Sequence, residues 1–168
     1  PFFPDTPAPP ERIFGLHGVL FSTWIALLIV QATLVRTRRT ALHRRIGPWG
    51  GALAAAMVVV GTWSALIAAA RPQGFIGIPV PPLQFLAVPL ADVVSFALLV
   101  AIGIACRRDP QRHKRLIMLA TITLLAAAIA RWPVLSAFGP PAYFGCTDLF
   151  IVALGVWVVW FSSLLTVT

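Results

Sequence analysis

Four ionisable residues interrupt long apolar stretches of this sequence and are the first candidates for chemistry: His17, Asp92, Arg131 and Asp148. A charged side chain inside hydrocarbon costs about 2.5–3.5 kcal/mol on insertion scales, so each of them needs a partner or a use. The set offers one imidazole, two carboxylates and one guanidinium. Such groups can form ion pairs, exchange protons or bind a polar solute.

Asp92 is the deepest of the four if residues 83–106 form one helix. It lies nine residues from the start of that stretch, which is about 13 Å along a helix that rises about 1.5 Å per residue. Pro89 precedes it by three positions. Because proline has no backbone N–H, it leaves the carbonyl of Phe85 without its helical partner, which predicts a loosened helix at this point.

Two interpretations of the polar cluster stay open. In the first, Asp92 or Asp148 pairs with Arg131 and holds neighbouring helices together. In the second, the cluster is a polar pocket open to the outer side, in which His17 and Asp92 respond to protons. Gly18 follows His17 and would let another chain or a cofactor approach, whereas a single histidine in a membrane helix can also be an ordinary hydrogen-bonding residue.

The residue types that are missing from the apolar stretches narrow the chemistry further. No lysine lies in them, which excludes a retinal-type Schiff base, and one histidine cannot supply both axial ligands of a haem. No glycine-rich phosphate loop, nucleophile elbow or HExxH motif is present. Cys106 and Cys146 are expected at opposite membrane faces, ~30 Å apart, so we expect neither a disulfide between them nor a metal site. Lipid is the expected ligand, with haem, quinone or pigment only at an interface shared with a partner.

The elements that must position these residues are predicted to be membrane helices. Hydrophobic residues make up 59% of the chain and charged residues 11%, whereas soluble domains average roughly 25% charged residues. About 20 apolar residues cross the hydrocarbon of a bilayer. Five stretches meet this requirement, and they predict an all-α transmembrane bundle that follows a Pro-rich segment at residues 1–13 and occupies residues 14–168 as one domain. The predicted spans are residues 14–35, 49–70, 83–106, 116–133 and 147–167.

The charge distribution predicts the orientation of this bundle. Ten of the thirteen Arg and Lys residues lie between residues 36 and 45 or between residues 107 and 115. Basic loops stay on the cytoplasmic side, so the N-terminus is expected outside and the C-terminus inside, in a bacterial inner membrane. This clustering explains the net charge of +8 without nucleic acid. The loop residues that we expect to face anionic lipid headgroups are Arg38, Arg39, His43, Arg44, Arg45, Arg107, Arg108, His113, Lys114 and Arg115.

Two further patterns concern how the helices pack. Gly47 and Gly51 form a small-xxx-small pair near the start of the second span, which would allow close approach of another helix. The segments 43–46 (HRRI) and 113–116 (HKRL) are 70 residues apart and each precedes an even-numbered span. They indicate either a repeated helical hairpin or the chance similarity of two basic loops.

The same residues carry a resemblance to known proteins. The opening FPDTP at residues 3–7, LHG at 16–18 with Phe21, Trp24 and Gln31, LHRRIG at 42–47, and HKRL at 113–116 with MLAT at 118–121 resemble a group of bacterial multi-pass inner-membrane proteins. The likeness covers most of the chain. It implies a polytopic helical fold and no assigned activity. Members carry one more helix before this region and further sequence after it, so we expect this chain to be part of a longer protein.

Three functions remain as hypotheses. The first is a non-catalytic accessory, structural or assembly subunit that packs against other membrane proteins. The second is a small-solute binding or transport protein with its site around Asp92. The third is a redox-linked subunit in which His17 contacts a haem, quinone or pigment that a partner also contacts. None of the three requires the chain to be an enzyme.

Overall fold

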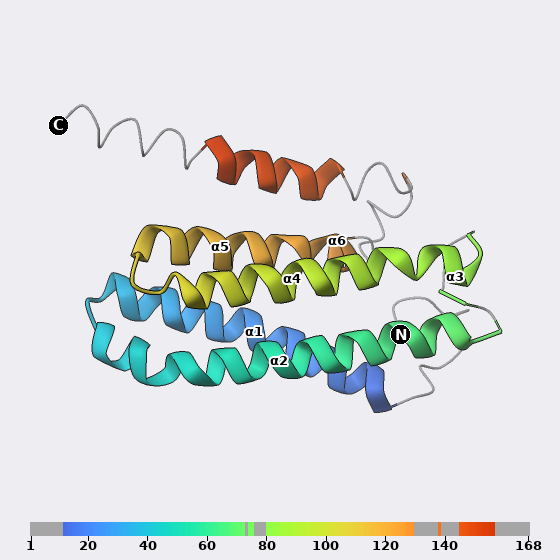
Figure 1. The fold of residues 1–168 in the computed structure, drawn as a ribbon, viewed down its shortest axis with the longest axis horizontal. Helices are drawn as coiled ribbons and strands as arrows, with labels where there is room; N and C mark the ends of the chain where they lie inside the picture. Colours follow the sequence, from blue (N-terminus) through green and yellow to red (C-terminus); the bar gives the residue numbers. More distant parts are fainter. Residues whose placement is uncertain (1–11, 73, 76–79, 130–137, 139–144, 157–168) are drawn as a thin grey trace. The chain divides into compact units, whose positions relative to one another are not determined.

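The computed structural model describes residues 12–72, 74–75, 80–129, 138 and 145–156, and these residues contain helices and no strand. The regular structure of these residues is all-helical, as the sequence predicts (Figure 1). The chain divides into two compact units, residues 1–91 and residues 92–168. The helices are α1 (Arg12–Arg36), α2 (Thr40–Ala70), α3 (Pro82–Phe85), α4 (Ala87–Ala105), α5 (Pro110–Thr123), α6 (Leu125–Ile129) and a further helix, Gly145–Val156.

Three of these helical segments are long and apolar enough to cross a membrane. They are α1, α2 and the combined segment Pro82–Ala105, with 25, 31 and 24 residues. They correspond to the first three predicted spans. The fourth and fifth predicted spans, residues 116–133 and 147–167, run into residues that the structure does not describe. Both therefore stay predictions, as does the orientation of the chain.

Two helices begin earlier than hydropathy predicts. α2 starts at Thr40 rather than at residue 49, and α5 starts at Pro110 rather than at residue 116. The apolar stretch marks where lipid begins, whereas the helix begins where its first N–H groups find acceptors. Asp109 provides this at α5, since its side chain accepts from the backbone N–H groups of Gln111 and Arg112 at 3.0 and 3.1 Å.

The predicted basic loops are therefore short turns followed by basic helical turns. Arg38 and Arg39 lie in the first turn, and Arg107 and Arg108 lie in the second. The residues that were expected in loops and instead lie on α2 or α5 are His43, Arg44, Arg45, His113, Lys114 and Arg115. This corrects the loop assignment, although their position next to the apolar stretches is unchanged.

The turn between α1 and α2 closes with a Schellman motif. The N–H of Arg39 bonds to the carbonyl of Leu34 at 2.8 Å, and the N–H of Arg38 bonds to the carbonyl of Val35 at 3.0 Å. Arg38 has a φ of +59°, the left-handed conformation that glycine usually supplies at this position. A residue with a Cβ atom pays about 1–2 kcal/mol for it.

Small residues form the buried side of α2 in the first unit. Its buried residues recur at helical spacing and are Ala54, Met57, Gly61, Ser64, Ala65 and Ala68. α1 packs against α2 (Figure 1), and a Cβ at Gly50 would lie 3.4 Å from the Cδ2 of Leu27. Of the predicted pair Gly47 and Gly51, Gly47 has no neighbouring atom of the described residues within 4 Å of such a Cβ, and the predicted contact of this pair with another helix stays a prediction.

α4 carries the third apolar segment and begins with an irregularity. Leu86 separates α3 from α4 and lies outside both helices. Pro89 supplies no N–H to the carbonyl of Phe85. The helix is interrupted at the next residue, Leu86, which itself keeps helical dihedral angles and donates to the carbonyl of Pro82 at 2.9 Å. Further along, the buried residues of α4 are Val93, Phe96, Val100 and Gly103.

We expect Arg38→Gly to stabilise the protein. Glycine adopts the left-handed conformation without a steric penalty, and part of this gain is offset by its greater freedom in the unfolded chain, so the free energy of unfolding should rise by roughly 0.5–1 kcal/mol. The matched control is Arg39→Gly, which removes the same charge at a φ of −84° and should be destabilising. Unfolding in mixed detergent measures both, and equal shifts would contradict the strain at Arg38.

Candidate functional site

His17 lies on the packed side of α1. It is half-buried, and its ring stacks on Phe21 with a centroid distance of 4.0 Å and an interplanar angle of 21°. Trp24 is buried one helical turn further along the same face. The spacing of His17, Phe21, Trp24 and Gln31 in the sequence is therefore the spacing of one packed helix face. On the opposite face of α1, Gly15, Gly18 and Ser22 are exposed.

Asp92 and Asp148 both belong to the second unit, and each is described there. Asp92 is half-buried at the edge of the packed face of α4, and Asp148 is exposed on the helix Gly145–Val156. No ion pair is formed by either carboxylate within the described part of the chain. Arg131 lies outside the described residues, so its predicted pairing with these carboxylates stays a prediction. His17 belongs to the other unit, and the predicted cluster of His17, Asp92, Arg131 and Asp148 stays a prediction.

The best-defined polar contact in the second unit joins α5 to the end of α4. The Nδ1 atom of His113 lies 2.8 Å from the carbonyl oxygen of Gly103. A carbonyl only accepts, so Nδ1 carries the proton in this contact. The N–H of Arg107, which would reach this carbonyl in a continued helix, bonds to Ile104 instead. His113 therefore satisfies a carbonyl that the end of α4 leaves unpaired.

Gly103 is required at this contact because α5 passes directly over it. A Cβ at Gly103 would lie 3.1 Å from the Cδ1 of Ile117 and 3.3 Å from the Cβ of Leu116. Gly103 is also buried. The missing side chain thus lets the two helices approach closely enough for the imidazole to reach the backbone. This contact was not predicted, although an isolated glycine in a Val- and Leu-rich helix is typical of close packing in lipid.

The first turns of α5 form the basic end of the second unit. Residues 107–115 contain four arginines, one lysine and one carboxylate, Asp109. Asp109 caps the helix and also pairs with Arg112 at 3.1 Å between side chains that are 46% and 74% exposed. An exposed pair of this kind contributes about 0–1 kcal/mol. The carboxylate is therefore engaged, and the region keeps a large positive excess.

The two hairpins repeat the same register. α2 begins at Thr40 and α5 at Pro110, so His43 and His113 are each the fourth residue of their helix. Their backbone N–H groups bond to the equivalent carbonyls, those of Arg39 at 3.1 Å and of Asp109 at 3.0 Å. The offset is 70 residues in each case. This agreement favours a repeated hairpin over a chance similarity of two basic segments.

Metal-binding geometry can also be assessed. Within the part of the chain that the structure describes, no group of three or more His, Cys, Asp or Glu side chains could hold a metal ion. Thr121 and Thr123 lie on the same helical stretch and donate to the backbone carbonyls of Ile117 and Ala120 at 2.9 and 2.8 Å.

Removing the imidazole should weaken the contact between α4 and α5. For His113→Ala we expect the free energy of unfolding to fall by about 0.5–1.5 kcal/mol, the usual contribution of one hydrogen bond. Gln111→Ala is the matched control, because Gln111 is exposed on the same turn. Nitrogen chemical shifts of His113 should also report a protonated Nδ1. A bare Nδ1 together with equal stability of both variants would contradict the contact.

Comparisons of the chain with protein families, with curated proteins and with solved structures find no match. Residue roles therefore come from the geometry of this chain.

Proposed function

We propose that the chain is a multi-pass protein of a bacterial inner membrane, with its N-terminus outside. The three long apolar helices support the membrane location. The orientation is supported by the two turns that contain Arg38, Arg39, Arg107 and Arg108, because such residues are retained on the cytoplasmic side. Each turn follows an odd-numbered predicted span, so in this topology both turns lie on the same side of the membrane.

The two cysteines of the chain can test this orientation. Cys106 follows α4 in a basic turn and Cys146 lies at the start of the helix Gly145–Val156, and both are free thiols. A maleimide that cannot cross the inner membrane should label Cys146 in intact cells and Cys106 only after permeabilisation. The variants Cys106→Ser and Cys146→Ser assign each signal. Labelling of Cys106 in intact cells would contradict the proposed orientation and indicate the opposite one.

Within that membrane, we propose a non-catalytic role as an accessory or assembly subunit that packs against another membrane protein. The observation that carries this proposal is the open face of α1. Among the described residues, no atom beyond the neighbouring helix backbone lies within 4 Å of a Cβ added at Gly15 or Gly18, and Ser22 is exposed. These residues are spaced by three and four positions and so lie on one helix face.

Lipid alone gives this face no advantage, because lipid tails cover large apolar side chains as well as small ones. Small residues matter where a second helix approaches, since they let two backbones come close and gain van der Waals contact. Ile25 and Ile29 continue the same face and are 40% and 61% exposed. The face thus combines close approach at one end with apolar side chains at the other.

Filling the open face should remove the partner and leave the fold unchanged. We expect Gly18→Leu to lower the amount of a stoichiometric partner that co-purifies in mild detergent by about tenfold, the effect of about 1.4 kcal/mol of binding free energy. Thermal stability of the isolated chain should not fall, since no side chain of the described residues lies within 4 Å of a Cβ added at this position and leucine favours a helix more than glycine does.

The matched control for this experiment is Ala52→Leu. It makes a similar change at an exposed position of α2, on the side opposite to the buried residues of that helix. It should retain the partner. A wild-type chain that purifies alone and monodisperse would contradict the accessory role, and so would equal loss of the partner in both variants.

A further inference from the structure

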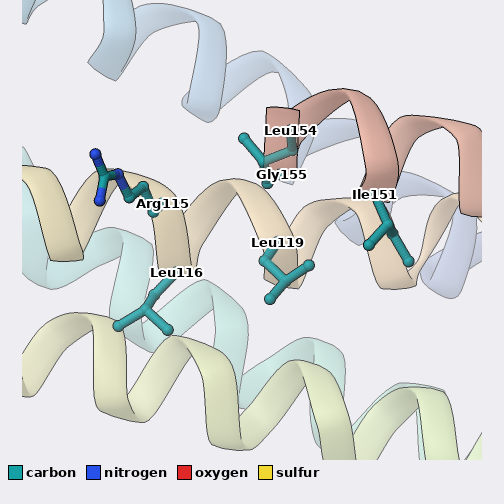
Figure 2. Close-up of a pocket in the computed structure, with 6 residues that line it drawn as sticks. All are labelled: Arg115, Leu116, Leu119, Ile151, Leu154 and Gly155. Atoms are coloured by element: carbon teal, nitrogen blue, oxygen red, sulfur yellow. The ribbon is translucent and has the colours of Figure 1, made fainter. Parts of the chain in front are cut away.

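An apolar groove lies between α5 and the helix Gly145–Val156 in the second unit. Figure 2 shows its lining, with Arg115 at one end, Leu119 one turn further along α5, and residues of the facing helix on the other side. Apart from Arg115, every lining residue is apolar or glycine: Leu116, Leu119, Ile151, Leu154 and Gly155. A ligand for this groove must therefore be apolar along most of its length.

The size of the groove limits what it can hold. Its volume is about 260 Å³, slightly less than the ~300–1,000 Å³ of pockets that enclose whole small ligands. It can therefore hold part of a molecule, such as a segment of a hydrocarbon chain. The two helices run antiparallel along it (Figures 1 and 2), so the groove is elongated in the direction of the helices.

Arg115 supplies the polar end of the groove, and one of its hydrogen-bond donors lacks an acceptor. Its Nε atom is buried and has no hydrogen-bond acceptor within the described part of the chain. A buried donor without a partner costs about 1–3 kcal/mol, and more when the group is charged. The nearby carboxylate, Asp109, already accepts from two backbone N–H groups and pairs with Arg112. The missing acceptor must come from outside these residues.

The charge around this end determines the sign of the ligand. Residues 107–115 carry five cationic side chains and one carboxylate, so an anion is attracted and a cation is repelled. Arg115 is the sixth residue of α5, roughly 8 Å from its start at about 1.5 Å per residue. In the proposed orientation this is the headgroup side of the inner leaflet, where phosphate oxygens accept hydrogen bonds from arginine.

We propose that this groove binds one anionic phospholipid, with an acyl chain between Leu119 and Gly155 and its phosphate on the guanidinium of Arg115. An anionic phospholipid combines the two features that the groove demands, a chain of methylene groups and an anion at one end. The proposal rests on the membrane location proposed above and not on the accessory role. The cysteine labelling tests the location separately, so a failure of one proposal is distinguishable from a failure of the other.

Native mass spectrometry of the purified full chain can test the site, with phosphatidylglycerol and phosphatidylcholine as probes. We expect the wild-type chain to retain one phosphatidylglycerol molecule at least tenfold more strongly than phosphatidylcholine. Arg115→Gln should lower the affinity for phosphatidylglycerol tenfold or more. Arg112→Gln is the matched control, because it removes the same charge from a side chain that is 74% exposed and should change the affinity less than twofold.

A second variant tests the apolar part without changing charge. Gly155→Leu places a side chain in the groove, where no atom of the described residues beyond the neighbouring helix backbone lies within 4 Å of an added Cβ, and should weaken the binding of both lipids by a similar factor. Circular dichroism and a monodisperse elution profile establish that each variant is folded. The proposal is overturned if Arg112→Gln and Arg115→Gln have equal effects, if Gly155→Leu has none, or if the folded wild-type chain retains neither lipid.

Discussion

The unpaired backbone groups at the ends of helices are the constraint that shapes both hairpins. A helix leaves about four carbonyl groups free at one end and about four N–H groups free at the other. In a hairpin with a short turn these ends lie together, next to the apolar part of the chain, where unmet hydrogen bonds are most costly. In the first hairpin, backbone groups form the missing hydrogen bonds, through the Schellman turn at Arg38. In the second hairpin, side chains form them, since Asp109 accepts from two N–H groups and His113 donates to the carbonyl of Gly103.

These two solutions have different consequences for the residues around them. The Schellman turn uses only backbone groups, so the side chains of Arg38 and Arg39 stay exposed and are not needed to cap a helix. Capping by Asp109 engages the one carboxylate of residues 107–115, so the cationic side chains of this segment remain in excess. The hydrogen bond from His113 also demands a glycine at position 103, because α5 must approach α4 closely for the imidazole to reach the carbonyl. Capping, packing and charge in the second unit therefore depend on one another.

The sequence predicted those parts of the fold that depend on local chemistry. The first three apolar segments follow from hydropathy, and the interruption at Leu86 lies next to the carbonyl for which Pro89 supplies no donor. Hydropathy predicts the start of α5 too late, because it reports where the apolar stretch begins, whereas the helix begins at the cap that Asp109 and Pro110 form.

The candidate sites were harder to predict because they depend on packing between helices. The spacing of His17, Phe21 and Trp24 was visible, but whether this face is packed or open depends on the neighbouring helix. The same holds for the groove beside Arg115, whose other wall lies about forty residues further along the chain. Hydropathy treats Leu119 and Ile151 alike and contains no term for which helices become neighbours.

In the membrane location proposed above, the length of α2 has a consequence for how the protein fits a bilayer. With 31 residues and about 1.5 Å per residue, it is about 46 Å long, whereas the hydrocarbon layer is about 30 Å thick. The excess is accommodated by tilt, by projection of the basic first turns among the headgroups, or by both. Because α1 packs along α2, the pair must respond as one body. A thicker or thinner bilayer would thus change the inclination of the whole hairpin and the depth at which Arg44 and Arg45 emerge.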